Sequence, residues 1–334
     1  MRIKILFLTE ISTNIGMGHL KRVNNLIDYF FARGHDCHLM VKASSVANID
    51  FMCPATLVES VDQVSQYIRT EHPELIIVDM LESEANVKIR NLISLSRQKF
   101  KLITIDDFYS NILIPDLEIK PWSNSPSLGD SLSGLKYLFF NQNFCSNLIK
   151  KVNKERINDV LISMGAADTN SATIKIICRL SKHFINIKFH AVIGPLFSEE
   201  DRLTISQIQC SNIVIYDGLE DLVDLYLKCD LAIIGGGQTK FETALFGIPA
   251  LILSNTELER KLSVIYEGMG FSTYISPSKK IDYQMLISKI NFLNDNPIKL
   301  KIMSIKARST IDCDGGRRVV SYVEQKLFNA SYPL

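Results

Sequence analysis

The feature that most restricts the fold is a repeated alternation of short apolar runs with amphipathic segments. Apolar runs typical of β-strands occupy, in the first half, residues 3–9, 38–41, 75–79 and 102–106. The intervening segments 19–34 and 84–98 place apolar residues at helical spacing, and Gly34 is a suitable helix end. Continuous apolar strands separated by helices indicate a parallel sheet that is covered on both faces.

The same alternation begins again in the second half. Strand-like runs there occupy residues 160–165, 187–194, 212–217, 231–236 and 249–254. A helical segment at 239–247 separates the last two of these runs. Two successive series of strands and helices in a chain of 334 residues predict an α/β protein with a GT-B-like arrangement, in which two doubly wound, Rossmann-like domains face each other across a cleft.

Composition indicates where the two halves meet. Residues 115–135 are rich in Pro, Ser and Gly and predict a long loop, and the charged stretch 149–159 predicts a hinge. We therefore expect an N-terminal domain at 1–150 and a C-terminal domain at 151–312. A terminal helix in 313–334 follows, for which packing back on the first domain is one option.

The overall composition excludes several classes of protein. The net charge is +1, so the chain as a whole has no strong attraction for nucleic acid. No run approaches the roughly 18 apolar residues of a membrane span, and the first ten residues are too quickly polar for a secretory signal. The seven cysteines are scattered without a C-x-x-C pair, which argues against a zinc site and a disulfide framework. We expect a cytoplasmic protein with reduced thiols.

The first candidate site is the turn Ile-Gly-Met-Gly-His-Leu-Lys-Arg at residues 15–22, which follows the first strand. Gly16 and Gly18 permit positive φ angles and a close approach of a ligand to the backbone. The N-terminus of the following helix offers free N–H groups and partial positive charge, which suit a phosphate. His19 falls in the first helical turn, where the positive helix end favours neutral imidazole, a base near pH 7. The alternative is an ordinary helix start with an exposed histidine.

Two further glycine turns follow strands of the second half. Three glycines at 235–237 end one apolar strand, and the helix expected from Thr239 carries Glu242 in its first turn. Glycine N–H groups there can approach a diphosphate, and Glu242 can accept hydrogen bonds from ribose hydroxyls. Thr239 and Glu242 also have the spacing of a capping box, and both interpretations can hold together. The turn at Gly165, followed by helix-capping residues at 168–170, can line a phosphate or sugar pocket.

Acidic residues end two strands of the first half, at Asp79 and at the pair Asp106 and Asp107. Such aspartates commonly cap the next helix, but the pair at 106 and 107 can also bind sugar hydroxyls or orient another side chain. A metal site is the weakest alternative, because no third ligand is suitably spaced. The terminal segment 311–327 combines a glycine turn, two arginines and an amphipathic helix; we expect packing, with an anion contact by one arginine as the alternative.

Together these motifs resemble a known group of proteins. The turn Gly-x-Gly-His-x-x-Arg and the block Gly-Gly-Gly-x-Thr-x-x-Glu-x-x-x-x-Gly-x-Pro are similar to those of the two-domain GT-B nucleotide-sugar enzymes. More narrowly, the chain resembles the UDP-2,4-diacetamido-2,4,6-trideoxy-β-L-altropyranose hydrolase family of pseudaminic acid biosynthesis. The segments that carry this resemblance are, in order, 14–22, 75–79, 103–108, 161–170 and 314–320. The peptidoglycan N-acetylglucosaminyltransferase is a broader relative with the same fold.

The resemblance implies a reaction on a UDP-sugar that requires neither a metal nor another cofactor. By it, His19 is the catalytic base that activates water, which attacks the anomeric carbon as UDP leaves. The glycine loop at 235–237 would hold the diphosphate, and Glu242 the ribose. The substrate-binding residues expected on this basis are Gly16, Gly18, Arg22, Asp107, Gly165, Gly236, Gly237, Thr239 and Glu242.

Two segments depart from the hydrolase pattern. The chain has Met80-Leu81-Glu82 where that family has His-Tyr-Gly, and residues 254–261 lack its Asn-Gln pair. The alternative function is therefore a GT-B glycosyltransferase, in which His19 deprotonates an acceptor hydroxyl instead of water. A nucleotide-sugar-binding protein without catalysis is a third possibility.

Overall fold

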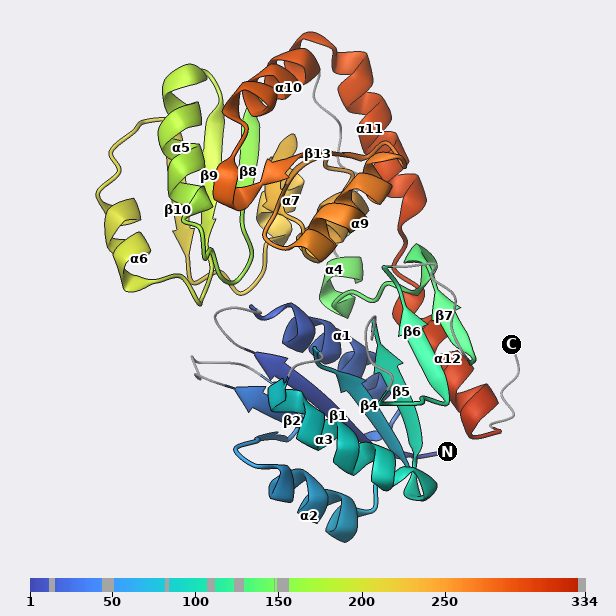
Figure 1. Ribbon diagram of the computed structural model, residues 1–334. Helices are drawn as coiled ribbons and strands as arrows, with labels where there is room; N and C mark the ends of the chain where they lie inside the picture. The colour runs from blue at the N-terminus through green and yellow to red at the C-terminus, as the bar shows by residue number, and fades with distance from the viewer. Residues whose placement is uncertain are drawn as a thin grey trace. The chain divides into compact units, whose positions relative to one another are not determined.

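The computed structural model describes residues 1–11, 16–43, 51–81, 84–106, 112–122, 129–146, 148 and 156–329. The chain divides into two compact units, each with its own sheet. Unit 1 comprises Met1–Cys145 together with Cys313–Leu334, and unit 2 comprises Ser146–Asp312. The chain therefore passes from unit 1 into unit 2 and returns, as the colours of Figure 1 show.

Unit 1 is built on a seven-stranded parallel sheet with the strand order β3-β2-β1-β4-β5-β6-β7. Its strands are β1 (Lys4–Ile11), β2 (Asp36–Ala43), β3 (Ala55–Leu57), β4 (Leu75–Asp79), β5 (Lys101–Ile105), β6 (Leu117–Lys120) and β7 (Ser131–Ser133). Its α-helices are α1 (Gly18–Ala32), α2 (Val61–Glu71), α3 (Glu84–Leu95), α4 (Gln142–Ser146) and α12 (Gly315–Leu327). Two 3-10 turns, η1 (Arg97–Lys99) and η2 (Leu135–Tyr137), complete the described elements.

Unit 2 repeats the design with six parallel strands in the order β10-β9-β8-β11-β12-β13. Its strands are β8 (Asp159–Ser163), β9 (Lys188–Ile193), β10 (Ile213–Asp217), β11 (Leu231–Gly235), β12 (Ala250–Ser254) and β13 (Ser272–Pro277). Its helices are α5 (Ala172–His183), α6 (Glu199–Ser206), α7 (Val223–Lys228), α8 (Thr239–Leu245), α9 (Glu257–Glu267), α10 (Tyr283–Asp295), α11 (Pro297–Thr310) and the 3-10 turn η3 (Ser278–Lys280).

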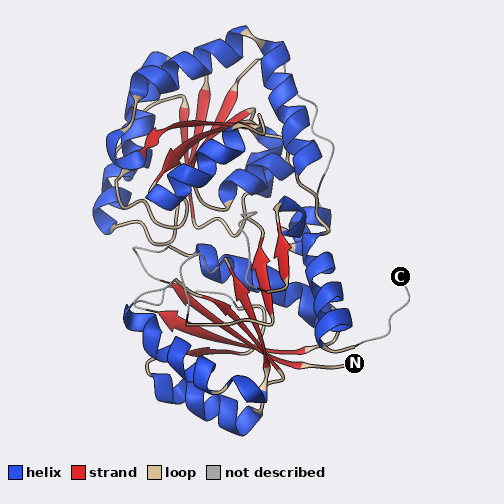
Figure 2. Ribbon diagram, turned by 45° about the vertical axis from the view of Figure 1, so that its right-hand side comes forward, coloured by secondary structure: helices blue, strands red, loops and turns tan. Residues whose placement is uncertain are grey.

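Helices cover both faces of each sheet, as Figure 2 shows for the two units separately. In unit 1, Phe7 of β1 faces a core that it shares with Leu26 of α1 and Val323 of α12. The next residue along the strand, Leu8, faces the opposite core with Val64 of α2. Because both faces of the strands are buried, apolar residues run along them without polar interruption, which is the pattern that the sequence shows.

In both sheets the strand order reverses beside the first strand of the unit. In unit 1 the reversal lies between β1 and β4, and in unit 2 between β8 and β11. Ligands of open parallel sheets bind outside the carboxyl ends of the strands at such a switch point. The turn that carries His19 follows β1, and the glycines at 235–237 follow β11, so each candidate motif lies at the switch point of its own unit.

The strands and helices expected from the sequence are present, with bounds shifted by a few residues. The expected loop at 115–135 is partly wrong, because β6 and β7 lie within it and extend the sheet of unit 1. The expected glycine turn before the last helix is also wrong, since α12 begins at Gly315 itself. A Cβ at Gly315 would lie 1.7 Å from the carbonyl oxygen of Leu138, so that glycine permits close packing of the helix end.

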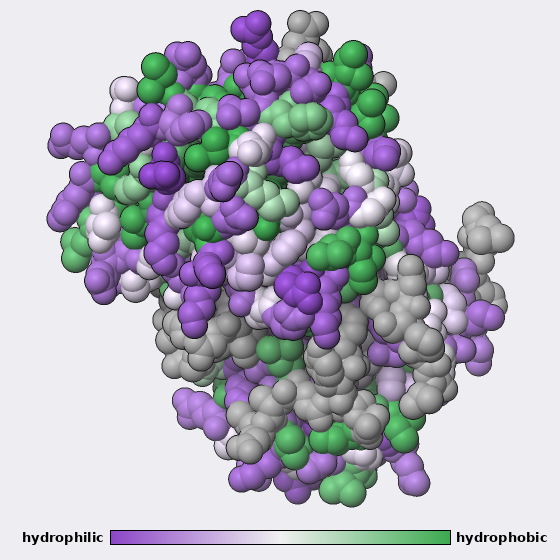
Figure 3. All heavy atoms as spheres, turned by 45° about the horizontal axis from the view of Figure 1, so that its top comes forward, coloured by the Kyte–Doolittle hydropathy of each residue, from purple (hydrophilic) through white to green (hydrophobic). Residues whose placement is uncertain are grey.

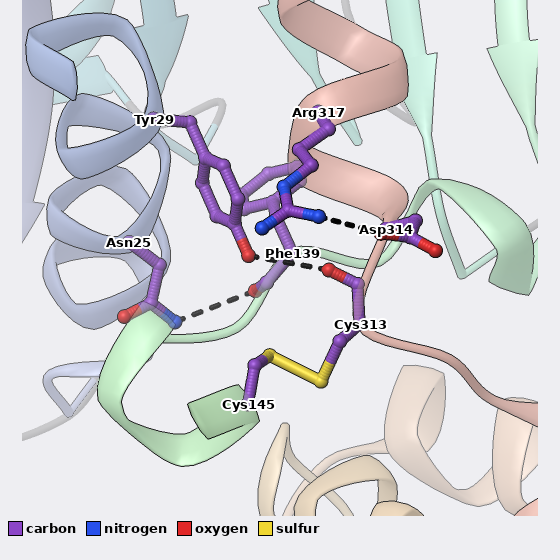
Figure 4. Close-up of a disulfide and its surroundings, with 7 residues drawn as sticks. All are labelled: Asn25, Tyr29, Phe139, Cys145, Cys313, Asp314 and Arg317. Carbon is purple, nitrogen blue, oxygen red and sulfur yellow. Dashed lines mark hydrogen bonds and ion pairs between the residues drawn. A yellow bond between two sulfur atoms is a disulfide. The ribbon is translucent and has the colours of Figure 1, made fainter.

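The expectation of reduced thiols is contradicted at two of the seven cysteines. Cys145 and Cys313 form a disulfide with a Cα–Cα distance of 5.7 Å (Figure 4). These residues end one segment of unit 1 and begin the other, so the bond closes a loop that contains unit 2. Nearby, the Tyr29 hydroxyl donates a 3.4 Å hydrogen bond to the Cys313 carbonyl. Sequence spacing gave no indication of this pair, because 168 positions separate the two cysteines.

Hydrophilic and hydrophobic residues are interspersed on the face shown in Figure 3. Single apolar side chains such as Ile298 and Ile305 of α11 are exposed. Among the described residues, no helix is both long enough and apolar enough to cross a membrane.

Candidate functional site

His19 is the second residue of α1 and lies close to the carboxyl end of β4. Gly16, with φ of +76°, turns the chain into the helix, and Met17 at the N-cap provides no capping side chain. The ring nitrogen Nδ1 of His19 lies 2.6 Å from Oδ1 of Asp79, the last residue of β4. The His19 side chain keeps 19% of its surface exposed, whereas that of Asp79 is fully buried. The pair therefore resembles a base with its orienting acid, and only the histidine can reach a ligand.

Arg22 lies one helical turn after His19 and contacts two carboxylates. Its Nε and Nη2 donate to Oδ2 and Oδ1 of Asp79, at 2.8 and 2.6 Å. Its Nη1 donates to Oδ2 of Asp106, the residue that follows β5. Its Cζ atom lies over the Trp122 ring, 5.4 Å from the ring centre. We call His19, Arg22, Asp79 and Asp106 the charged cluster.

The charged cluster shifts the pKa values of its two acids in opposite directions. Burial alone would raise the pKa of Asp79, but the charges and hydrogen bonds of Arg22 and His19 outweigh it and lower the pKa to about 2. Burial raises the pKa of Asp106 to about 6 with help from nearby Asp79, although Arg22 opposes the shift. Oδ1 of Asp106 is buried and has no hydrogen-bond partner among the described residues. Asp79 is therefore the firmly ionised acid of the pair.

A second polar group lies at the carboxyl ends of β1 and β2 in unit 1. Glu10 accepts hydrogen bonds from the Leu81 N–H at 2.5 Å and from Asn86 Nδ2 at 2.9 Å. Lys42 Nζ donates to Asn86 Oδ1 at 2.7 Å. Glu10 is buried, so these contacts satisfy a carboxylate that faces little water. Sequence analysis did not single out Glu10, although an acid at the end of an apolar strand is the same signal that marks Asp79.

The glycine loop of unit 2 is packed closely against neighbouring backbone and side chains. A Cβ at Gly236 would lie 2.7 Å from Cβ of Glu259, while a Cβ at Gly237 would meet nothing nearer than 4.0 Å. Lys240 of α8 is fully buried and donates through Nζ to the Gly236 carbonyl oxygen. Because the C=O and N–H of a trans peptide point in opposite directions, the Gly237 N–H points away from Lys240. Gly237 is therefore the glycine whose N–H and open side remain for a ligand.

Glu242 is not part of a capping box. Helix α8 begins after Gln238, which makes no side-chain capping bond, so the predicted box between Thr239 and Glu242 does not form. Instead, Oε2 of Glu242 accepts a 2.6 Å hydrogen bond from the Tyr226 hydroxyl, and Glu242 is 1% exposed. Burial together with this acid raises the pKa of Tyr226 well above its usual value. The Glu242 carboxylate thus lies inside unit 2.

The turn after β8 lies at the same edge of the unit 2 sheet. Gly165 has φ of +95°, and a Cβ at Gly194 would lie 2.3 Å from the Gly165 carbonyl oxygen. Asp168 accepts hydrogen bonds from the N–H groups of Ala172 and Thr173, which confirms it as a cap of α5. The small residues here therefore allow two loops to lie against each other.

A chain of polar side chains joins three loops at this edge. Asn170 donates to Ser278 Oγ at 2.8 Å, and Ser278 donates to Asn255 Oδ1 at 2.7 Å. The Asn255 N–H donates to Glu259 Oε2 at 2.6 Å. This network was not predicted, because its members are distant in sequence and each is an ordinary loop residue.

The structure brings His19, Gly16, Gly18 and Arg22 together in unit 1. It brings Gly165, Gly236, Gly237, Thr239 and Glu242 to one edge of unit 2. Asp107 and Glu82 lie outside the described residues. Within the described part of the chain, no group of three or more His, Cys, Asp or Glu side chains is arranged to hold a metal ion.

Comparison with curated proteins identifies two distant relatives, and no protein-family model matches the chain. An uncharacterized protein of Methanocaldococcus jannaschii is 26% identical over 307 residues, which are 83% of this chain and 61% of that protein. The UDP-N-acetylglucosamine--N-acetylmuramyl-(pentapeptide) pyrophosphoryl-undecaprenol N-acetylglucosamine transferase of Francisella philomiragia is 25% identical over 49% of this chain and 46% of its own length. The chain thus spans about three fifths and about half of these relatives.

Solved structures share the fold over nearly the whole chain. MurG of Acinetobacter baumannii has a TM-score of 0.63 at 12% identity and covers 96% of this chain and 99% of its own. A co-structure of S. aureus MnaA with UDP has a TM-score of 0.66 at 16% identity and covers 100% and 99%. The spinosyn rhamnosyltransferase SpnG complexed with thymidine diphosphate has a TM-score of 0.66 at 13% identity and covers 96% and 100%. The predicted fold class is confirmed: the chain consists of two Rossmann-like α/β domains of the GT-B type.

Proposed function

We propose that the protein is a nucleotide-sugar enzyme that transfers a glycosyl group from a nucleoside-diphosphate sugar to an acceptor hydroxyl, with His19 as the catalytic base. The observation that carries this proposal is the 2.6 Å contact between Nδ1 of His19 and the ionised Asp79. An ionised carboxylate can only accept a hydrogen bond, so Nδ1 carries a proton, and in the neutral imidazole Nε2 then presents a lone pair. Nε2 is the atom that would take the proton.

The proposed reaction needs few groups. Nε2 of His19 removes the proton of the acceptor hydroxyl while its oxygen attacks the anomeric carbon. The bond between that carbon and the diphosphate oxygen breaks, and the diphosphate leaves with the electron pair. Backbone N–H groups at the glycine loop of unit 2, including that of Gly237, would stabilise the negative charge of the leaving group. The residues for both steps are present in the chain.

The Francisella relative is a transferase, which favours transfer. The solved structures that share the fold include both a spinosyn rhamnosyltransferase and a UDP-N-acetylglucosamine 2-epimerase, so the fold by itself does not select one of these reactions. Of the solved structures that share the fold, the MnaA structure contains UDP and the SpnG structure contains thymidine diphosphate. We therefore propose a pyrimidine nucleoside diphosphate as the leaving group, with UDP as the first choice.

Hydrolysis is the second candidate, because the same dyad of His19 and Asp79 can activate water. The order of five motifs along the chain favours it, since these motifs resemble the altropyranose hydrolase family described above. The absence of the His-Tyr-Gly motif after Asp79 favours transfer, because this chain has Met80-Leu81-Glu82 there. Both reactions use the same base, and they differ only in what receives the sugar.

The test is nucleotide release from a panel of UDP- and dTDP-sugars with EDTA present, followed by NMR with and without a panel of hydroxyl acceptors. Release that requires an acceptor supports transfer. Rapid release of UDP with water alone would replace transfer with hydrolysis. Saturable nucleotide binding without turnover under any condition, and unchanged in His19→Ala, would leave a binding protein and contradict both reactions.

A further inference from the structure

The sequence suggested that Arg22 binds substrate, but its contacts indicate a different role. The Arg22 side chain is only 6% exposed, and three of its nitrogens donate to the carboxylates of Asp79 and Asp106. The guanidinium carbon also lies over the Trp122 ring, 5.4 Å from its centre. A cation that is enclosed in this way has little surface left for a ligand.

We propose that Arg22 is a positioning residue that keeps Asp79 ionised and thereby keeps Nε2 of His19 free of a proton. This proposal rests on the proposed function, since it assigns how the base of that reaction is prepared. The Asp79 side chain is fully buried, and a buried carboxyl without a positive partner favours its neutral form. Arg22 supplies that partner through two parallel hydrogen bonds, the strongest geometry available for a guanidinium and a carboxylate.

Loss of Arg22 would change where the protons of the dyad lie. Asp79 and His19 would then hold one additional proton between them. If that proton is on Asp79, its O–H donates to Nδ1 and the ring proton moves to Nε2. If it is on the imidazole, both ring nitrogens carry protons. In either arrangement Nε2 is protonated and the base is lost.

Asp106 has a complementary role, because it holds the other side of the guanidinium. Its contact with Nη1 fixes Arg22 between two acids, and Asp106 itself is held at φ of +46°. With both acids ionised and His19 neutral, the charged cluster has a net charge of −1, which becomes zero when His19 accepts a proton. Other charged groups at this edge of unit 1 include Glu10 and Lys42, which bind Asn86, and Lys120 at the end of β6, which pairs with Glu118. The cluster is therefore suited to receive a proton at His19.

The experiment measures the ring protons of His19 directly, in the full-length protein without substrate. Long-range ¹H–¹⁵N NMR at pH 7.5 distinguishes protonated from unprotonated ring nitrogens, and a His19→Gln spectrum assigns the signals among the six histidines. We expect Nδ1 protonated and Nε2 free in the unaltered protein. In Arg22→Met we expect Nε2 to be protonated, with kcat at least about 100-fold lower and KM for the nucleotide sugar changed less than about threefold.

Three further variants separate charge from geometry. Arg22→Lys keeps the positive charge but loses the two parallel hydrogen bonds to Asp79. We therefore expect Nε2 to stay free, while kcat falls about tenfold because Asp79 is held less firmly. Asp106→Asn keeps an acceptor for Nη1, and we expect the tautomer of the unaltered protein. Arg260→Met, at an exposed ion pair with Glu257 in unit 2, is the matched control and should change neither measurement.

Each outcome decides one question. A folded Arg22→Met protein that keeps Nε2 free overturns the inference, and so does a folded Arg22→Lys protein whose Nε2 carries a proton although the positive charge is retained. If Arg22→Met does not fold, Arg22→Lys remains the deciding variant. If the tautomers change as expected but no nucleotide sugar reacts, the inference holds and the proposed function fails.

Discussion

The two switch points of the molecule have the same topology but contrasting chemistry. At the edge of unit 1, ionisable side chains meet: Asp79 lies within hydrogen-bond distance of His19 and Arg22, and Asp106 within hydrogen-bond distance of Arg22. At the edge of unit 2, glycines form the loop, and the nearby charges of Lys240 and Glu242 are both buried in internal contacts. One fold thus presents side-chain chemistry in one unit and backbone N–H groups in the other.

This difference shows what a parallel sheet provides and what it leaves to the sequence. The sheet brings the carboxyl ends of its strands, and the helix that follows each of them, to one edge. In unit 1, the helix after β1 carries His19 and the end of β4 carries Asp79. In unit 2, the turn at the end of β11 consists of glycines, which have no side chains. We infer that proton transfer belongs to unit 1 and diphosphate binding to unit 2.

The largest expected effect is a loss of kcat without a loss of nucleotide affinity when His19 or Asp79 of unit 1 is replaced. We expect His19→Ala to lower kcat about 1,000-fold, because general base catalysis contributes factors of about 10² to 10⁴. Asp79→Asn should lower kcat by a similar factor, since an amide can donate to Nδ1 and leave the proton on Nε2. Isothermal titration calorimetry should show an unchanged affinity for the free nucleotide in both variants. A tenfold loss of affinity for free nucleotide in either variant would contradict the assignment of proton transfer to unit 1 and diphosphate binding to unit 2.

The second prediction compares the stability of the two units, because only unit 1 contains the disulfide. Replacing Cys145 by Ser, or reducing the bond with dithiothreitol, should lower the free energy of unfolding of unit 1 by about 2–4 kcal/mol. Calorimetry should show the shift in one of two transitions. Cys178→Ser, at an exposed free thiol of unit 2, is the control and should leave both transitions in place. Non-reducing mass spectrometry that finds seven free thiols would contradict the bond itself.

The third prediction tests the backbone site of unit 2 with a matched pair of glycines. Gly236→Ala brings a Cβ to 2.7 Å from Cβ of Glu259, whereas Gly237→Ala meets only Oε1 of Glu259 at 4.0 Å. We expect Gly236→Ala to weaken nucleotide binding about 10- to 100-fold by displacing the loop, a change of roughly 1.4–2.7 kcal/mol. Gly237→Ala should fold normally, and its effect on binding reports how closely the ligand approaches. Equal affinities in both variants and the unaltered protein would exclude this loop as the diphosphate site.

The smallest effect concerns how the stability of unit 1 depends on pH. The two acids of the charged cluster lie in this unit and have shifted pKa values. The pKa of Asp106 is about 6 in the folded protein, above its ordinary value of 3.8, so the folded state binds that proton more tightly. Stability from this group falls as pH rises from about 4 to about 6, at no more than about 1.4 kcal/mol per pH unit.

Asp79 acts in the opposite sense over a lower range. Its pKa is lowered to about 2, so its contribution to stability is complete above about pH 4 and is lost as pH falls through 2. Asp106→Asn should therefore flatten the profile between pH 4 and 6 and leave the loss below pH 4. Denaturant titrations of unit 1 across this range measure both slopes, and an unchanged slope in the variant would contradict the assignment.

The sequence predicts the central strands of both sheets because these strands are buried on two faces and contain continuous apolar runs. It does not predict β6 and β7, which are short and lie at the sheet edge, so neither length nor pattern distinguishes them from loop. The last helix was expected from the sequence, but its first residue, Gly315, was expected to lie in a turn before it, because only the neighbouring backbone of Leu138 shows why glycine is needed there.

For the candidate sites, the sequence indicates where polar residues cluster but not what they contact. His19 was identified from its glycine turn, whereas Asp79 was noted only as an acid at a strand end, for which a helix cap was the expected role. Arg22 was expected to bind substrate, because an arginine in such a turn gives no sign that two buried acids will enclose it. Lys240 gave no signal at all, since lysine is rarely buried completely. Tertiary contacts decide these roles.

Whether His19 is the catalytic base is tested most directly by nucleotide release. The unaltered protein and His19→Ala are compared on one panel of UDP- and dTDP-sugars with EDTA present. We expect release by the unaltered protein, an at least 100-fold slower release by His19→Ala, and equal binding of free nucleotide by both. Equal rates of release by the two proteins would show that His19 is not the base and would contradict the proposed function.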